Sequence, residues 1–426
     1  MSRARLWALA FLVSAATALS SAPALAQGST PCEALLEHAL QGYRTSIPRL
    51  RQYAWGDVRA LCAGQATTMR SDSVAWYQDI ARFDMVGNVQ FRDTTVMLDA
   101  DSARYFLDDE RLEAYGRVRL VNLSNGTILT GPNLTYWRAV PSLRNTTELL
   151  ATGRPTVQYH GTADTAGVEP YLIIGDVVRL RGTEDAWAAG DVQIDRSDFH
   201  AAADSAILGL VSNRGHLIGH ASVTGGGADS SGYHLRGREV AFTSRDDRLN
   251  WVQARDSAHA ESSDFTITAD TVEFTIVDDM VQGGFAWGSS IKTRAVSSRN
   301  TITADSLAID SPNQKLEELR AFGSARAVSV QDSLDEDPDW IVGDSLIAKF
   351  SETEWGQRYL DTLIAFGNAA AFYRMYSVAG GDVPDINYSR GDMIRAVFTV
   401  LGLSKVDVRG NTNGVHLQRR RTRQQP

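Results

Sequence analysis

The chain has 426 residues with 51 acidic and 42 basic side chains, a formal net charge of −9. An acidic body of this kind does not match the phosphate backbone of nucleic acids, so no nucleic-acid partner is expected. The basic residues that cluster in residues 418–426 are expected to form a solvated C-terminal tail.

Residues 1–26 have the pattern of a cleavable secretory signal peptide. Arg3 and Arg5 precede an apolar stretch that begins at Leu6, and the sequence Ala-Leu-Ala at 24–26, with small residues at 24 and 26, completes a cleavage site. No later stretch approaches the roughly 18 apolar residues of a membrane-spanning helix. We therefore expect an exported mature chain that begins near Gln27.

Residues 27–54 are expected to form a capping helix and a linker. A capping box with proline in the first turn opens at residues 30–33, and Gly42 follows as a stop signal. Between them lie the apolar residues Leu35, Leu36 and Leu40. Such a helix would cover one end of a larger structure.

Cys32 and Cys62 are the only two cysteines of the chain. In an exported protein, a pair at this separation most simply forms a disulfide, and without a nearby pair of histidines it makes a poor zinc site. The bridge would close a loop of about 30 residues and contribute on the order of 3 kcal/mol.

A short pattern recurs ten times within residues 55–417: small residue, Asp, any residue, apolar, any residue, apolar. The fourth and sixth places are apolar in all 20 instances, whereas the third and fifth are apolar in 7 of 20. This alternation predicts antiparallel strands with one buried face. Repeats that each hide one face must stack to share an interior, so the sequence predicts an elongated all-β rod.

Eight of the ten copies carry Asp at the second place, as at Asp101, and a Gly such as Gly116 lies between the strand runs. Glycine there suits a bulge or a corner with positive φ. A repeated Asp at a corner is expected to accept backbone hydrogen bonds rather than to catalyse. Calcium binding is the alternative, but only residues 225–229 resemble a calcium-binding β-roll, and that repeat must recur to form sites.

Motifs for catalysis, cofactors or metals are missing from the sequence. His216 and His220 are four residues apart, but glycines flank them in strand-like sequence, which argues against a helical metal site. The acidic run at residues 332–339 contains a proline and suits a loop. We expect neither an enzyme nor a cofactor.

Three segments carry a family resemblance: Gly-Asn-Val-x-Phe at 87–91, Leu-Asp-Ala-Asp-Ser-Ala-x-Tyr at 98–105 and Leu-Glu-Ala-Tyr-Gly-x-Val at 112–118. Similar segments occur at 302–309 and, more loosely, in the other copies. Together they resemble the repeat of the OstA-like family, the lipopolysaccharide-transport bridge proteins of the LptA type and the periplasmic N-terminal domain of LptD.

The resemblance implies an open β-jellyroll of two facing antiparallel sheets, located in the periplasm and acting with the outer membrane. Such a protein is a non-enzymatic bridge that holds the acyl chains of lipopolysaccharide, or a related glycolipid, in an apolar groove. It pairs with other lipopolysaccharide-transport proteins through its edge strands. The groove-lining role carries over to the inward-facing positions Val74, Trp76, Tyr105, Leu134, Tyr136, Leu180, Leu208, Val240, Phe242, Phe274, Leu307, Ile309 and Leu346.

Two other interpretations of the sequence remain open. One is a structural or adhesive secreted β-repeat protein whose interior is a closed core. The other is a carbohydrate-active β-helix, which would need clustered carboxylates, whereas the repeated Asp residues are spread along the chain.

Overall fold

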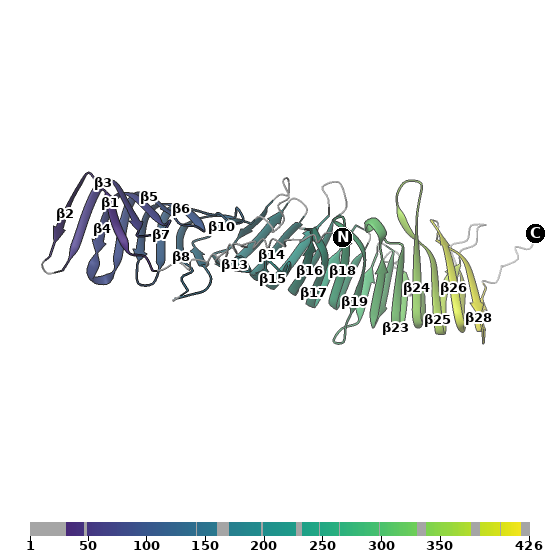
Figure 1. Cartoon of the computed structure of the whole chain (residues 1–426). Coiled ribbons are helices and arrows are strands. Elements are labelled where there is room, and N and C mark those ends of the chain that lie inside the picture. Colours follow the sequence, from purple (N-terminus) through teal and green to yellow (C-terminus); the bar gives the residue numbers. More distant parts are fainter. Residues whose placement is uncertain are drawn as a thin grey trace, which may run out of the picture.

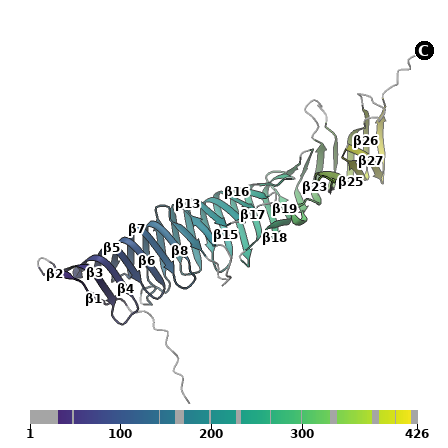
Figure 2. The ribbon, with the colours of Figure 1, turned by 90° about the horizontal axis from the view of Figure 1, so that it is seen from above.

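A computed structural model describes residues 31–418, apart from 47–48, 142, 160–169, 197–198, 227–231, 247, 264, 298, 330–337, 376–383 and 401. The predicted signal peptide, the acidic run up to residue 337 and residues 419–426 of the tail lie outside the described residues. The all-β prediction is confirmed, since the described chain forms 28 strands and two short 3-10 turns, η1 (Gln78–Ile80) and η2 (Pro312–Gln314). The strands stack side by side into an elongated body with its first and last strands at opposite ends (Figure 1 and Figure 2).

The strands follow one another along the chain in three groups. The first group is β1 (Ala34–His38), β2 (Gln41–Thr45), β3 (Arg51–Cys62), β4 (Thr68–Tyr77), β5 (Arg82–Arg92), β6 (Val96–Phe106), β7 (Arg111–Asn122) and β8 (Ile128–Trp137). The middle group is β9 (Glu148–Thr152), β10 (Thr156–Tyr159), β11 (Tyr171–Ile174), β12 (Val177–Arg181), β13 (Asp185–Arg196), β14 (Phe199–Gly209), β15 (Arg214–Gly225), β16 (Tyr233–Arg245), β17 (Arg248–Glu261) and β18 (Thr266–Val277). The last group is β19 (Met280–Trp287), β20 (Thr293–Val296), β21 (Asn300–Ala304), β22 (Ser306–Asp310), β23 (Glu318–Ser329), β24 (Trp340–Glu352), β25 (Arg358–Met375), β26 (Asp385–Thr399), β27 (Gly402–Arg409) and β28 (Asn413–Leu417).

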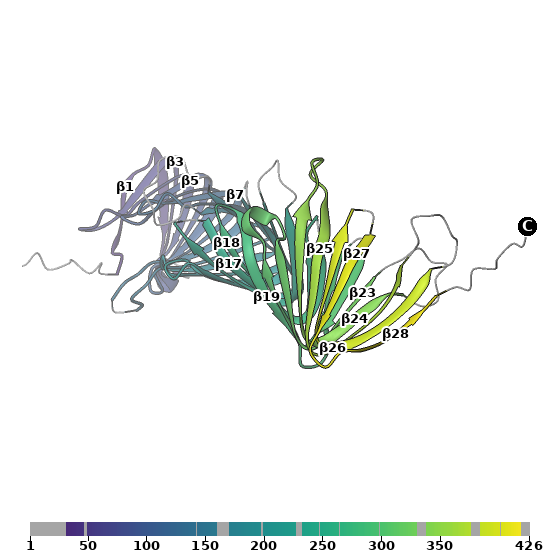
Figure 3. The same cartoon turned by 90° about the vertical axis from the view of Figure 1, so that its right-hand side faces the viewer.

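Each long strand bends once, and the bend divides the structure into two arms. The antiparallel register shifts there; in β6 against β7, for example, it shifts between Asp99 and Ser102. Arm A contains the short strands β2, β9, β12, β19, β22 and β27 and the halves of the long strands that pair with them. Arm B contains the short strands β1, β10, β11, β20, β21 and β28 and the other halves of the long strands. Seen along the body, the two arms meet at the bend and open as a V (Figure 3).

Short strands replace the bent ones at two places. Between β8 and β13 the chain forms β9 and β12 in arm A and β10 and β11 in arm B, so the pairings close a ring of six strands. A second ring joins β18, β19, β22, β23, β21 and β20 in the same way. The strand pairing is therefore continuous from β1 to β28.

The predicted helix near the N-terminus is wrong. Residues Ala34–His38 form β1 and pair with the arm B half of β3, while Gln41–Thr45 form β2 and pair with its arm A half. A helix this short is marginal on its own, whereas two strands satisfy the backbone groups that β3 would otherwise leave unpaired. Leu35 and Leu40, two apolar residues of the expected helix, are 48% and 72% exposed. Cys32 and Cys62 form a disulfide, with Cα atoms 5.0 Å apart, that ties the start of β1 to the end of β3.

Candidate functional site

The residues expected to line a groove all point into the space between the arms. Twelve of the thirteen are buried, from Tyr105 at 0% exposed to Leu208 at 8%, and only Trp76 is half-buried. Leu208 and Phe242 border a small cavity of about 60 Å³. The other buried residues of the set pack as core, so the inward orientation holds but their contact with a lipid remains a prediction.

Aromatic side chains from the two arms fill the interior of the first two thirds of the body. Phe91 of arm B lies 5.7 Å from Tyr105 and 6.1 Å from Tyr136 of arm A, measured between ring centroids. Farther along, Phe199 contacts Phe242 at 5.4 Å. Tyr233 and Phe274 repeat this arrangement at 6.0 Å. Apart from the small cavity beside Leu208 and Phe242, the two arms pack against each other in this part of the described chain.

A buried polar cluster joins the tips of the two arms near the N-terminal end, and we call it the clasp. It comprises Gln65, Asp93, Tyr105, Glu110, Tyr136 and Arg138. Asp93, in the β5–β6 turn of arm B, accepts a hydrogen bond of 2.8 Å from the Tyr136 hydroxyl of arm A. Arg138, which follows β8, donates to Glu110 at 2.6 Å and to the Gln65 side-chain oxygen, in an arm B turn, at 3.0 Å.

Burial and neighbouring charges shift the pKa values of Tyr105, Tyr136 and Arg138 in the clasp. Burial raises the pKa of the Tyr105 and Tyr136 hydroxyls well above the ordinary range, so both remain hydrogen-bond donors. Burial alone would lower the pKa of Arg138, but Tyr105, Glu110 and Asp93 together raise it. The Glu110 carboxylate, fully buried, also accepts the backbone N–H of Cys32, so the disulfide segment belongs to the same closure.

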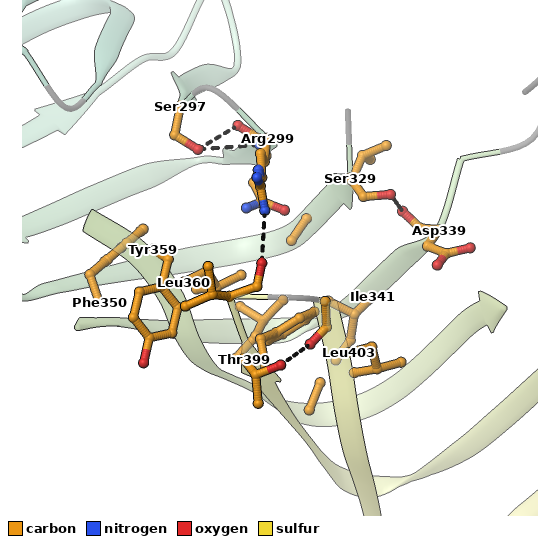
Figure 4. Close-up of a pocket in the computed structure, with 18 of the residues that line it drawn as sticks. Ser297, Arg299, Ser329, Asp339, Ile341, Phe350, Tyr359, Leu360, Thr399 and Leu403 are labelled. Atoms are coloured by element: carbon orange, nitrogen blue, oxygen red, sulfur yellow. Dashed lines mark hydrogen bonds between the residues drawn. The ribbon is translucent and has the colours of Figure 1, made fainter. Parts of the chain in front are cut away.

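A large cavity lies between the arms at the other end of the body, over β23 to β27 (Figure 4). Its volume is about 730 Å³. Arm A supplies Phe350, Leu360, Leu363, Ile394, Ala396, Phe398, Leu403 and Val406, and arm B supplies Ala327, Ile341, Ala371 and Tyr373. These side chains form an apolar inner wall, and this is the part of the V whose interior is not filled by aromatic contacts between the arms.

Side-chain volume explains why the cavity lies at this end. The sixth place of the repeat is occupied by Trp76, Tyr105, Tyr136, Leu180, Leu208, Phe242, Phe274 and Ile309 in the first eight copies, and by Ala348 and Ala396 in the last two. Ala396 lines the cavity directly. Alanine cannot reach across to the opposite arm, so the last repeats leave the space that aromatic rings occupy elsewhere.

Polar side chains from the turns surround the apolar wall. Arm B contributes Arg299 and Asp339 (Figure 4), and arm A contributes Arg358. The Asp339 carboxylate is paired with Arg374 at 3.0 Å. Arg299, in the β20–β21 turn, donates to the backbone carbonyl of Val400 in the β26–β27 turn at 3.3 Å, which bridges the two arms across the rim.

The sequence did not predict the residues that line this cavity, although the repeat pattern marks two of them as facing inward. Ile394 and Ala396 occupy the fourth and sixth places of the last repeat copy, and both line the cavity. Leu363, Phe398 and Leu403 lie outside the repeat pattern, and only the pairing of β25, β26 and β27 brings them together.

No protein-family model matches the chain, and no curated protein matches it in sequence. Within the described residues, no group of three or more His, Cys, Asp or Glu side chains could hold a metal ion. No helix in that part of the chain is long and apolar enough to cross a membrane.

Proposed function

We propose that the protein is a non-enzymatic lipid-binding protein that holds acyl chains between the two arms near its C-terminal end. The observation that carries the proposal is the apolar cavity of about 730 Å³ bordered by Leu363, Ile394 and Phe398. Its volume lies within the range of roughly 300–1,000 Å³ typical of ligand pockets. Each methylene that leaves water for such a wall contributes about 0.8 kcal/mol.

The sequence resemblance supplies the client and the setting of this proposal. We propose an open β-jellyroll of the OstA-like type that carries lipopolysaccharide or a related glycolipid through the periplasm toward the outer membrane. The two arms, joined at one bend and diverging toward β27 and β28, support the open form at this end (Figure 3).

Partner proteins would pair with the edge strands. Strands β27 and β28 each pair with β26 on one side, and all residues of β28 are exposed. An exposed edge offers unpaired backbone groups to another strand. This supports the proposed assembly with other lipopolysaccharide-transport proteins.

The filled interior between β3 and β18 favours the alternative function for that part of the chain. Residues such as Tyr105 and Phe274, buried to 2% exposure or less, are packed as in a structural rod with a closed core. In the combined account, this part is a rigid spacer, and lipid is held only beyond it.

Native mass spectrometry with lipid extraction tests the proposal. The wild type would be purified under mild conditions from a Gram-negative host and compared with Ala396→Phe, which places a ring inside the cavity. Val397→Phe is the matched control, because Val397 lies one residue along β26 and does not line the cavity. We expect acylated glycolipid with the wild type and the control, and a smaller amount of it with Ala396→Phe. A wild type that is free of lipid and takes up no added lipopolysaccharide would overturn the proposal in favour of the structural rod.

A further inference from the structure

Arg299 lies on the cavity rim and forms no ion pair with another residue of the described chain. It is exposed, it belongs to arm B, and its guanidinium donates to the Val400 carbonyl of arm A at 3.3 Å. A backbone carbonyl is a neutral acceptor and leaves the charge of the arginine uncompensated. The bond therefore joins the arms at the mouth of an apolar cavity through one solvent-accessible contact (Figure 4).

Three charged side chains of the described chain line the cavity, and two of them have an ionic partner. Arg299, Asp339 and Arg358 are the charged residues of the described chain that line the cavity. Asp339 is neutralised by Arg374, at 3.0 Å. Arg358 donates to the Leu316 carbonyl at 2.9 Å and lies 3.9 Å from Glu352, whose carboxylate is already bound by a lysine. Among the described residues that line the cavity, Arg299 is thus the charged side chain whose charge no neighbouring side chain offsets.

The two ends of the body differ in how the arms are joined. Near the N-terminal end, the clasp closes the V with buried groups, among them Glu110 at 0% and Arg138 at 5% exposed. At the cavity, the exposed Arg299–Val400 bond links the two arms, and a competing acceptor can replace it at little cost because both groups remain hydrated. Access from the side is therefore expected at the cavity and not at the clasp.

We propose that the cavity binds an anionic amphiphile with one or more acyl chains. Its phosphate or similar anionic group accepts hydrogen bonds from Arg299 in place of the Val400 carbonyl. This inference rests on the proposed function, since the acyl chains occupy the cavity described there. It adds the charge of the ligand, the residue that recognises it and the side from which it is admitted. A planar guanidinium suits a phosphate because it can donate two parallel hydrogen bonds.

Calorimetric titration with two amphiphiles of equal chain length tests the inference. n-Dodecyl phosphate and n-dodecyl maltoside would each be added to the full chain below their critical micelle concentrations. We expect the phosphate to bind about tenfold more tightly, the gain from one exposed charge-assisted contact. Arg299→Gln, which keeps a donor but removes the charge, should abolish this preference and leave maltoside binding unchanged, whereas Arg299→Lys should keep part of it.

The control is Arg294→Ala, which removes an exposed arginine from β20 in the same arm that does not line the cavity. It should retain the preference for the phosphate. Equal binding of both amphiphiles by the wild type, or a preference that survives in Arg299→Gln, would overturn the role of Arg299 while leaving the lipid cavity in place. Binding of neither amphiphile would overturn the cavity function as well. Inorganic phosphate alone should not bind at the same concentration, and if it does, the site recognises free phosphate and not an amphiphile.

Discussion

The side chain of Asp101 in β6 lies against Gly116 of the paired strand β7, where both strands bend. A Cβ added to Gly116 would be 2.7 Å from both the Cβ and the Cγ of Asp101, and Gly116 has φ +93°. The same contact recurs in the pairs Asp72–Gly87, Asp176–Gly190, Asp204–Gly219, Asp305–Gly323, Asp344–Gly367 and Asp392–Gly410. The recurring Asp and Gly of the sequence therefore contact each other where two paired strands bend, and the role of Asp101 is structural.

Replacing Gly116 by alanine should destabilise the bend. The new Cβ meets the Asp101 Cβ, so rotation of the Asp side chain cannot relieve the contact. Gly126→Ala is the matched control, because Gly126 also has positive φ, +72°, but has nothing within 4 Å of the added Cβ. We expect Gly116→Ala to cost about 1–3 kcal/mol more than Gly126→Ala in urea-induced unfolding. Equal losses in the two variants would show that the Asp contact is irrelevant.

The repeated Asp also predicts a dependence of stability on pH. Asp270 accepts hydrogen bonds from the backbone N–H groups of Ser289 and Ser290, each at 2.6 Å, and the bond from Ser290 is the main cause that lowers the pKa of Asp270. A carboxyl whose pKa is lower in the folded state stabilises the fold above its unfolded pKa of about 3.9 and loses that contribution as the pH falls through the folded value.

Asp270→Asn should therefore unfold at a lower urea concentration than the wild type at pH 7. The difference between the urea midpoints of the two proteins should narrow below about pH 4 and disappear toward about pH 2, where the side chain at position 270 is neutral in both. Unfolding midpoints at a series of pH values measure it. A gap of constant size down to the lowest pH would mean that the charge of Asp270 does not contribute.

Breaking the clasp should be costly because it would leave a buried charge. Arg138→Met removes the partner of Glu110, whose side chain is 0% exposed, and we expect a loss of about 3–5 kcal/mol. The double variant with Glu110→Gln should recover part of that loss, since the uncompensated carboxylate is gone. Hydrogen exchange, measured peptide by peptide over β3–β8, reports the local loss of stability in each variant. Arg154→Met is the control at an exposed ion pair with Asp191, where about 0–1 kcal/mol is expected; a similar loss in both variants would contradict this account of the clasp.

Replacing an inward-facing alanine by phenylalanine should destabilise the fold near the N-terminal end but not at the cavity. Ala396→Phe adds a ring inside the cavity and should leave stability unchanged or raise it. Ala103→Phe adds the same ring at a site that is 2% exposed within the filled interior, where overpacking costs about 1–3 kcal/mol. Thermal unfolding of both variants provides the comparison. Equal destabilisation would mean that the cavity is collapsed in solution.

The strands and corners could be predicted from the sequence because both are local. Alternation of apolar residues marks a strand, and Asp followed later by Gly marks a bend. The N-terminal strands β1 and β2 could not be predicted, because pairing with β3 overrides the local helix signal of residues 30–42. The clasp was missed since Asp93, Glu110 and Arg138 lie in turns outside the repeat pattern. The alanines that create the cavity were visible, but which side chains oppose them depends on the offset of the two arms.

Site-specific photocrosslinking tests the central claim most directly. A benzophenone-bearing phenylalanine analogue would replace Phe398, which lines the cavity, and in a second chain Arg395, which is exposed on the other face of β26. After irradiation in a Gram-negative host, the account predicts a lipid adduct, seen as a mass increase, at position 398 and none at 395. Equal labelling at the two positions, or none at position 398 in a folded protein, would contradict the claim that lipid is held between the arms.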